Sequence, residues 1–391
     1  MKKILALVLA LVMVLGLAAC SSSTAKSDSA AADTDTLKIG VVCPISGVSA
    51  IAGKYITHGI QVVEKELGGK IDINGKEYNI EFIYMDNEAS EEKTTNVFQK
   101  LINEENVIAI VGPDMSKCAL AAGPIAQNAG CPVVATFATN TAVTEVGNYI
   151  FRACFIDPFQ GKMAATYCWD RGYKTAAVMY NNADAYATGL YEAFVESYTE
   201  YGGEVIATEE YSGSDVKDYN VQLTKLASAG ADVLFLPNLL SELGLQIQQA
   251  RTAGITGPIL CGDSADTPEV AEVAGPAVED VGFVSAYSAE STDPASVEFV
   301  TKYSELHNGE TPNSNAELAY EATQMVLYAL KNAKELTRDG VRDALESLSG
   351  LELPSGKMTM DPETRNPVKG GVVMVYDAEG TAHFVSSVNP E

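Results

Sequence analysis

Short apolar runs rich in Val, Ile and Leu alternate along the chain with longer segments in which apolar residues recur every three or four positions. The short runs indicate buried strands, and the longer segments indicate amphipathic helices. The predicted strands are 37–42, 78–84, 107–111, 133–136, 175–180, 204–210, 233–236, 259–261 and 282–286. The predicted helices are 53–67, 90–103, 118–129, 159–169, 189–201, 219–229, 240–253, 296–307, 317–334 and 337–348. This alternation predicts an α/β fold with parallel sheets.

The predicted elements form two successive strand–helix series. A chain of 391 residues is also longer than one hydrophobic core usually serves. We therefore predict two doubly wound parallel-sheet lobes. Because ligands of such sheets bind beyond the carboxyl ends of the strands, functional residues should lie directly after strands.

The N-terminus has the pattern of an export signal. Lys2 and Lys3 precede an apolar run from Ile4 to Leu15, and small residues lead to Cys20. The run is too short to span a bilayer. It resembles a bacterial lipoprotein signal, in which the cysteine is lipidated and becomes the new N-terminus; the alternative is an ordinary cleaved signal that leaves Cys20 behind. The first interpretation predicts a signal peptide over 1–19 and an extracytoplasmic protein anchored to the cell membrane by lipid on Cys20.

The composition limits the kinds of partner that the protein can bind. Residues 21–36 are Ser, Ala, Thr and Asp apart from Lys26, so 20–36 is predicted to be a disordered tether. No later apolar stretch is long enough to span a membrane. The formal net charge of −26 disfavours nucleic acid and anionic headgroups, although most of these carboxylates are typical of an ordinary solvated surface.

The cysteines do not predict a metal site. No CxxC pair occurs, and none of the three histidines has ligand spacing to a cysteine, so we expect no metal and no cofactor. Disulfides in an exported protein stay possible. The six cysteines after Cys20 are Cys43, Cys118, Cys131, Cys154, Cys168 and Cys261.

Two hydroxyl side chains follow neighbouring strands of the first series. Ser116 comes after a Gly-Pro turn and before the predicted helix 118–129, where its hydroxyl and the free N–H groups of the helix can bind a carboxylate. The alternative is that Ser116 only caps the helix. Thr139 can supply a second hydroxyl, or it can be a threonine that stabilises a turn.

Two further candidates follow strands of the second series. Asp263 lies between Gly262 and Ser264, directly after the strand 259–261. If it faces a cleft, it can pair with a ligand ammonium; if it faces solvent, it has no such role. Tyr186, in the segment 181–186, can cover a ligand with its ring, or it can be a packing or surface tyrosine.

Four segments occur in a specific order and spacing: Leu37-Lys38-Ile39-Gly40-Val41, Pro44-Ile45-Ser46-Gly47, Val111-Gly112-Pro113 and Gln248-Gln249-Ala250-Arg251-Thr252-Ala253-Gly254. Together they resemble the periplasmic-type solute-binding proteins of branched-chain amino acid ABC importers, the type I family of leucine/isoleucine/valine-binding proteins. The resemblance extends from 37 to about 387. It implies two lobes, 37–156 with 287–360 and 157–286 with 361–391, joined by three hinge crossovers that close over a ligand.

The resemblance also implies roles for single residues. Ser116 and Thr139 match positions that hold the ligand α-carboxylate, and Tyr186 matches an aromatic lid. Asp263 matches the acid that receives the α-ammonium, a glutamate in the leucine/isoleucine/valine-binding protein. The side-chain pocket departs from the family pattern. Aromatic residues are expected where this chain has Ala52 and Leu239, and a small residue where it has Phe137; these three and Ala138 complete the predicted ligand-binding set.

The implied function is capture of an amino acid by cleft closure and its delivery, by a monomeric protein, to the permease subunits of an ABC importer. A leucine-like aliphatic amino acid is the first expected ligand, an aromatic amino acid the second, and a peptide or amide the third. A tethered sensor that docks on a receptor is the alternative. An enzyme is disfavoured because the chain lacks GxGxxG after its first strand and contains no GxxxxGK[ST] or GxSxG segment.

Overall fold

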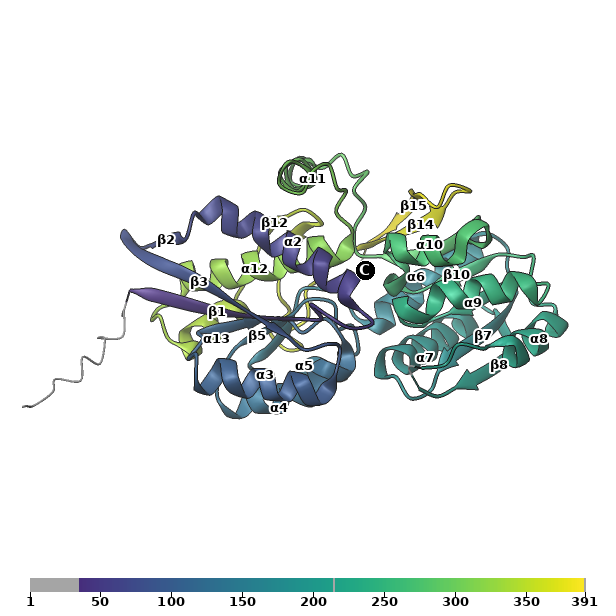
Figure 1. Ribbon diagram of the computed structural model, residues 1–391, viewed down its shortest axis with the longest axis horizontal. Helices are drawn as coiled ribbons and strands as arrows, with labels where there is room; N and C mark the ends of the chain where they lie inside the picture. The colour runs from purple at the N-terminus through teal and green to yellow at the C-terminus, as the bar shows by residue number, and fades with distance from the viewer. Residues whose placement is uncertain (1–34, 214, 390–391) are drawn as a thin grey trace, which may run out of the picture. The chain divides into compact units, whose positions relative to one another are not determined.

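The computed structural model describes residues 35–213 and 215–389 and builds them around two separate large sheets (Figure 1). The first sheet has the strand order β2-β3-β1-β4-β5-β6. Its core strands β1, β4, β5 and β6 are parallel, and β2 and β3 form an antiparallel hairpin at one edge. The strands are β1 (Thr36–Cys43), β2 (Lys70–Ile73), β3 (Lys76–Asp86), β4 (Ala109–Val111), β5 (Val133–Ala135) and β6 (Ile150–Arg152).

The second sheet has the order β15-β14-β11-β10-β9-β7-β8. The strands from β7 to β11 are parallel, and β14 and β15 add an antiparallel edge beside β11. The strands are β7 (Thr175–Asn181), β8 (Glu204–Tyr211), β9 (Val233–Leu236), β10 (Ile259–Cys261), β11 (Val281–Ser285), β14 (Gly371–Tyr376) and β15 (Ala382–Val388).

We call each large sheet with its covering helices a lobe. Lobe one holds the first sheet and the helices α2 (Ala50–Leu67), α3 (Glu91–Asn103), α4 (Ser116–Asn128), α5 (Ala142–Glu145), α11 (Pro294–Leu306), α12 (Ser314–Asn332) and α13 (Arg338–Glu346). Lobe two holds the second sheet and the helices α6 (Asp157–Asp170), α7 (Ala185–Glu200), α8 (Asn220–Ala229), α9 (Leu240–Thr252) and α10 (Pro268–Ala274), with 3₁₀ turns at Asp263–Ala265 and Gly275–Val278.

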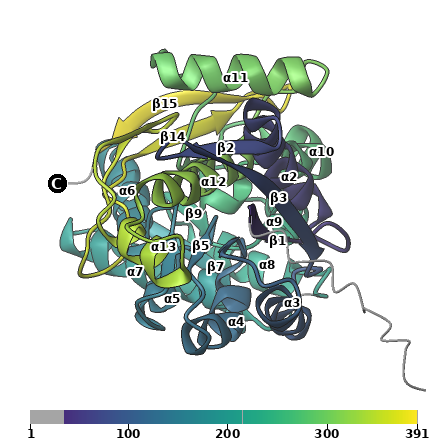
Figure 2. The ribbon, with the colours of Figure 1, turned by 90° about the vertical axis from the view of Figure 1, so that its left-hand side faces the viewer.

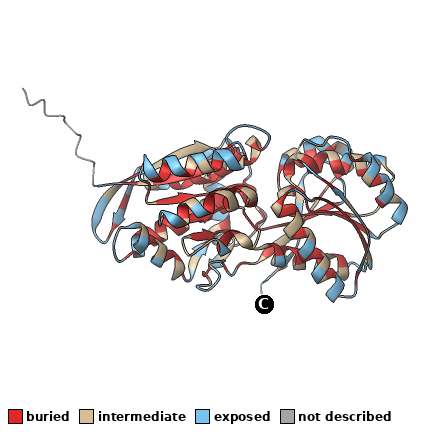
Figure 3. Ribbon diagram, turned by 90° about the horizontal axis from the view of Figure 1, so that it is seen from below, coloured by how far each residue is buried: buried red, intermediate tan, exposed pale blue. Residues whose placement is uncertain are grey.

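The chain passes between the lobes three times: after β6, after β11, and again before β14. A small ribbon of β12 (Leu351–Leu353) and β13 (Gly356–Met358) precedes the last passage. The predicted α/β class with two mainly parallel lobes is therefore confirmed. The prediction succeeded because strands covered by helices on both faces are continuous apolar runs. The strands buried along their whole length are β4, β5, β9, β10 and β11 (Figure 3).

Helix ends and packing follow from particular residues. The Ser90 hydroxyl caps α3 by accepting from the Lys93 N–H at 3.4 Å, and the same helix buries Phe98 and Leu101 against the sheet. The helices α2 and α12 lie side by side (Figure 2). A Cβ on Gly59 of α2 would lie only 2.0 Å from the Ala316 carbonyl oxygen, so this close approach requires glycine.

Some elements were not predicted. The strands β2, β6, β12 and β13 have only three or four residues, and each contains a charged residue, so none is a continuous apolar run like β9 or β10. The edge strands β14 and β15 also lie outside the predicted set, as do the short helices α5 and α10. The predicted helix 189–201 instead begins at Ala185, because the Asp184 carboxylate accepts from the N–H groups of Tyr186 and Ala187 and caps α7 there.

Two other predictions concern the cysteines and the N-terminus. Each of the six cysteines named above is a buried free thiol, so the disulfides that the sequence left open do not occur among them. The predicted signal peptide 1–19, Cys20 and nearly all of the tether lie outside the described residues. Among the helices of the described ranges, none is both long and apolar enough to cross a membrane.

Candidate functional site

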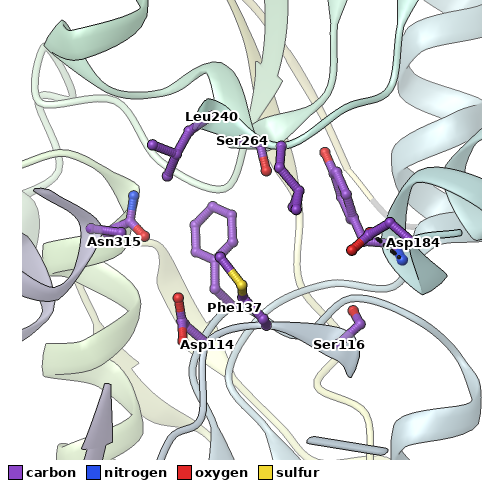
Figure 4. A pocket seen from close by; sticks show the side chains of 11 residues that line it. Asp114, Ser116, Phe137, Asp184, Leu240, Ser264 and Asn315 are labelled. Atoms are coloured by element: carbon purple, nitrogen blue, oxygen red, sulfur yellow. Dashed lines mark hydrogen bonds between the residues drawn. The ribbon is translucent and has the colours of Figure 1, made fainter. Parts of the chain in front are cut away.

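A pocket lies where the two lobes face each other, at the carboxyl ends of their parallel strands (Figure 4). Both lobes supply its walls, which is the location expected for a ligand site in doubly wound sheets. From lobe one come Ala52, Asp114, Met115, Ser116, Phe137 and Asn315, and from lobe two come Asp184, Tyr186, Leu239, Leu240 and Ser264.

Ser116 lies in the pocket wall as the first residue of α4. Its side chain does not cap that helix, because Met115 occupies the N-cap position. The Ser116 Oγ instead accepts from the Asn140 N–H at 3.2 Å, in the loop after β5. The hydroxyl hydrogen stays available to a ligand, and the first N–H groups of α4 lie beside it. The simple capping interpretation of Ser116 is therefore wrong.

The loop 137–141 is held by a buried arginine. Arg152, at the end of β6, donates from Nη1 to the Ala138 carbonyl oxygen at 2.6 Å and from Nη2 to the Asn140 carbonyl oxygen at 2.8 Å. Thr139 within this loop is completely buried, and its Oγ1 has no hydrogen-bond partner. Ala138 and Thr139 thus lie behind the pocket wall rather than among the residues that line it.

An aspartate and a tyrosine form the polar part of lobe two. The Tyr186 hydroxyl donates to Asp263 Oδ1 at 2.8 Å, and the Asp263 N–H donates to Gln160 Oε1 at 2.8 Å. Asp263 is 1% exposed, and its second oxygen, Oδ2, is buried without a partner. Asp263 does not line the pocket itself but meets it through Tyr186. A Cβ on Gly262 would lie 2.2 Å from the Tyr186 hydroxyl oxygen, so glycine leaves the room for this contact.

Burial changes the acidity of this region. It raises the pKa of the Asp263 carboxyl to about 8, and the charge of Asp157 adds to the effect. It also raises the pKa of Asp157 itself, at the start of α6, to about 7. Both Asp157 oxygens are buried without partners. Removal from water therefore favours a positively charged partner at both carboxyl groups, and the charge of Arg152 already lowers the pKa of Asp157.

The rest of the pocket is mostly apolar. The Phe137 ring lies in the middle of the view in Figure 4, between Leu240 and the carboxyl group of Asp114. Ala52 from α2 and Leu239, the N-cap residue of α9, extend this apolar surface. A ligand side chain placed here would contact Phe137 and the leucines.

Known proteins resemble this chain in sequence and in fold. The sequence profile described as periplasmic binding protein matches residues 36–381. The chain belongs to the periplasmic binding protein family. The resemblance stated from the sequence is thus confirmed, and the two-lobed fold agrees with it.

Similar proteins are named as amino acid binding proteins or their homologs. A Leu/Ile/Val-binding protein homolog from Brucella suis is 27% identical over 355 residues, which cover 89% of this chain and 92% of that protein. The crystal structure of a leucine-binding protein, LivK, from Thermotoga maritima is 31% identical with a TM-score of 0.85, covering 90% of this chain and 99% of that one. LivJ from Streptococcus pneumoniae, solved with isoleucine, is 30% identical with a TM-score of 0.82 and the same coverage.

The structure brings the predicted residues of this periplasmic binding protein close together without testing their roles. Ala52, Ser116, Phe137, Tyr186 and Leu239 line the pocket. Asp263, Thr139 and Ala138 lie beside it, Asp263 through Tyr186 and the other two in the loop that Arg152 holds. Their part in binding stays a prediction.

Sequence reasoning assigned no role to several pocket residues. Asp184 lies in the segment 181–186, Ser264 directly follows Asp263, and Asp114 lies between the predicted strand 107–111 and Ser116. Their position after strands was therefore a usable signal. Asn315 had none, because it begins a helix far along the chain and reaches the pocket only through the packing of α12 in lobe one.

Proposed function

We propose that this protein is an extracytoplasmic solute-binding protein, anchored by lipid on Cys20, that captures an α-amino acid between its lobes and delivers it to an ABC import permease. One observation carries the proposal: a hydroxyl at a helix start in lobe one and a buried aspartate–tyrosine pair in lobe two meet at the same pocket. In an amino acid zwitterion, the carboxylate suits the hydroxyl of lobe one and the ammonium suits the aspartate of lobe two.

The carboxylate end is assigned to lobe one. The Ser116 hydroxyl and the free N–H groups of α4 are donors at the positive end of a helix, which favours an anion. The unpartnered Thr139 hydroxyl lies behind them as a further donor. None of these groups carries a charge, so the carboxylate is held by directed hydrogen bonds.

The ammonium end is assigned to lobe two. Asp263 keeps one oxygen on Tyr186 and has the other buried without a partner. A ligand ammonium is the group that would satisfy that oxygen and compensate the buried charge. The Tyr186 ring lies between Asp263 and the pocket, so the tyrosine must turn slightly aside or share the carboxylate with the ligand.

Closure couples the two ends. Asn140 of lobe one donates from Nδ2 to the Ala185 carbonyl oxygen of lobe two at 2.8 Å, close to the pocket. On the other side, Asn313 and the Ser314 N–H contact Asp266 at 2.9 and 3.0 Å. Because each end of the ligand is held by a different lobe, a bound amino acid favours the closed form over the open one. A permease can then recognise the closed, ligand-bound form.

Names of similar proteins indicate which ligands to test first. The relatives reported above are named for leucine, isoleucine and valine, and the apolar surface of Phe137, Leu239 and Leu240 suits such side chains. These names place branched-chain amino acids first in the order of screening.

A thermal-shift screen of the purified protein against all twenty amino acids tests the proposal. A ligand present at 100 times its Kd should stabilise the folded protein by about 2.7 kcal/mol, which raises Tm by several degrees. The matching amino alcohols and N-acetyl derivatives are the controls, since each lacks one of the two charges. A protein whose Tm responds to no amino acid, or equally to the singly charged derivatives, would contradict the proposal.

A further inference from the structure

The carboxyl group of Asp114 lines the pocket without a part in holding either end of the zwitterion. Asp114 lies in the loop between β4 and α4, two residues before Ser116, and lines the pocket. Its side chain is almost fully buried, with 5% of the residue exposed, and its Oδ1 is buried without a hydrogen-bond partner. In Figure 4 the carboxyl group points into the pocket beside Phe137.

An amide shares this part of the pocket. Asn315 is the second residue of α12, is 6% exposed and also lines the pocket. Its position is fixed because Asn313 caps α12 by accepting from the Ala316 N–H at 3.3 Å. Figure 4 shows Asp114 and Asn315 on one side of the Phe137 ring, with Ser116 and Asp184 on the other.

A purely aliphatic ligand side chain placed beside Asp114 would weaken binding, because it would leave the buried carboxyl group without a hydrogen bond. A buried carboxyl group without a partner loses its hydration, and the cost is larger than that of a neutral group. A leucine or valine side chain placed against Asp114 would remove the remaining water and return no hydrogen bond. A ligand group that donates a hydrogen bond to Asp114 compensates this cost, because hydrogen bonds to charged acceptors are stronger than those between neutral groups.

The ligand group must also suit Asn315. A side-chain amide offers both a donor and an acceptor, so beside Asp114 the pocket presents two acceptors and one donor. A carboxamide or a hydroxyl can donate to Asp114 and accept from Asn315. An ammonium can donate to Asp114 and to the Asn315 amide oxygen but leaves the Asn315 N–H group without an acceptor, and an aliphatic group can do neither.

We propose that Asp114 and Asn315 select an α-amino acid with an apolar stem and a neutral amide or hydroxyl at the tip of its side chain. The stem contacts Phe137 and Leu240, and the tip hydrogen-bonds to Asp114 and Asn315. This inference rests on the proposed function, since it takes the zwitterion to be held at Ser116 and Asp263. It makes Asp114 the residue that determines specificity.

Pairs of amino acids that are close in shape but differ in polarity give the test. Valine with threonine, leucine with asparagine, methionine with glutamine, and phenylalanine with tyrosine are titrated calorimetrically into the wild-type protein and into Asp114→Leu. In the best-binding pair, the polar member should bind the wild type about 10- to 100-fold more tightly than its apolar counterpart, the range expected for a hydrogen bond to a charged group. Asp114→Leu should abolish or reverse that preference.

The variant is suited to the test because it removes a buried carboxyl group whose Oδ1 has no partner and puts an apolar side chain of similar size in its place. Asp114→Leu should therefore fold, and its Tm is measured beside that of the wild type. Glu81→Gln, which neutralises an exposed carboxylate on β3 of the same lobe, is the matched control and should keep the wild-type preference.

The outcomes separate the two proposals. Tighter binding of the apolar member in the wild type, tighter binding of lysine than of every neutral amino acid, or a preference unchanged in Asp114→Leu would overturn the specificity assignment and leave amino acid capture standing. Absence of binding by any α-amino acid would overturn both.

Discussion

Asp263→Asn is the variant that most directly probes how the ligand is held. Asparagine keeps the shape of the side chain and an oxygen that can accept from the Tyr186 hydroxyl, so the contact at 2.8 Å can persist. What it removes is the negative charge. The wild-type residue is 1% exposed, so its attraction for an ammonium is not screened by solvent.

The size of the effect follows from this burial. Removal of one partner from a buried, hydrogen-bonded charge pair costs about 2–5 kcal/mol. At about 1.4 kcal/mol for each factor of ten, Kd should rise by about 30-fold to several thousandfold. Calorimetric titration with the amino acid that stabilises the wild type most measures the change directly.

Proton release gives a second readout of the same group. Burial raises the pKa of the Asp263 carboxyl to about 8, so at pH 7 this carboxyl is mostly protonated before the ligand arrives. An ammonium ligand requires the ionised form, so binding must release a proton. Titrations at pH 7 in two buffers with different ionisation enthalpies should detect more proton release from the wild type than from Asp263→Asn, in which Asp157 is the carboxyl that still titrates near pH 7.

The same shift predicts how stability depends on pH. Between the ordinary pKa of 3.8 and the raised value of about 8, the folded protein holds a proton that the unfolded chain has lost. The free energy of unfolding therefore falls as pH rises, by at most about 1.4 kcal/mol per pH unit for this one group. Urea unfolding should show Asp263→Asn gaining stability relative to the wild type from pH 5 to pH 8.

Glu272→Gln is the matched control, because it neutralises an exposed carboxylate on α10 of the same lobe and should change neither affinity nor proton release. Wild-type affinity in a correctly folded Asp263→Asn protein would refute the assignment of the ammonium to Asp263. So would equal proton release in the two proteins.

Two other predictions address the anchor and the core. Cells supplied with a labelled fatty acid should incorporate it into the wild-type protein and not into Cys20→Ser; label retained in the variant would contradict lipidation at that residue. Lys369→Met should lower the free energy of unfolding by about 3–5 kcal/mol in urea titrations, because it removes the cation that contacts buried Glu321 at 2.6 Å and Glu317 at 3.4 Å. A double variant with Glu321→Gln should recover part of that loss, and a loss below about 1 kcal/mol in the single variant would contradict the role of the lysine.

Much of the fold could be predicted from local pattern. Buried parallel strands are continuous apolar runs, so 233–236 and 259–261 were predicted with the bounds that β9 and β10 have. The strand-end rule also led to Ser116 and Tyr186, both of which line the pocket. Where hydrogen bonding overrides periodicity, the prediction was less accurate: Asp184 starts α7 four residues before the apolar pattern indicates.

By itself the sequence determined the α/β class, the two series of strands and the short segments that end at the pocket, because those features depend on neighbours within a few positions. Only the tertiary structure decided which of these segments meet. Tyr186 hydrogen-bonds to Asp263 although the two are 77 positions apart in the sequence. Asn315 lines the same pocket as Asp114, but it lies on α12, which follows the strands of lobe two in the chain up to β11. Burial of these polar groups, and hence the raised pKa of Asp263, arises when distant segments pack together, and no local pattern of residues encodes it.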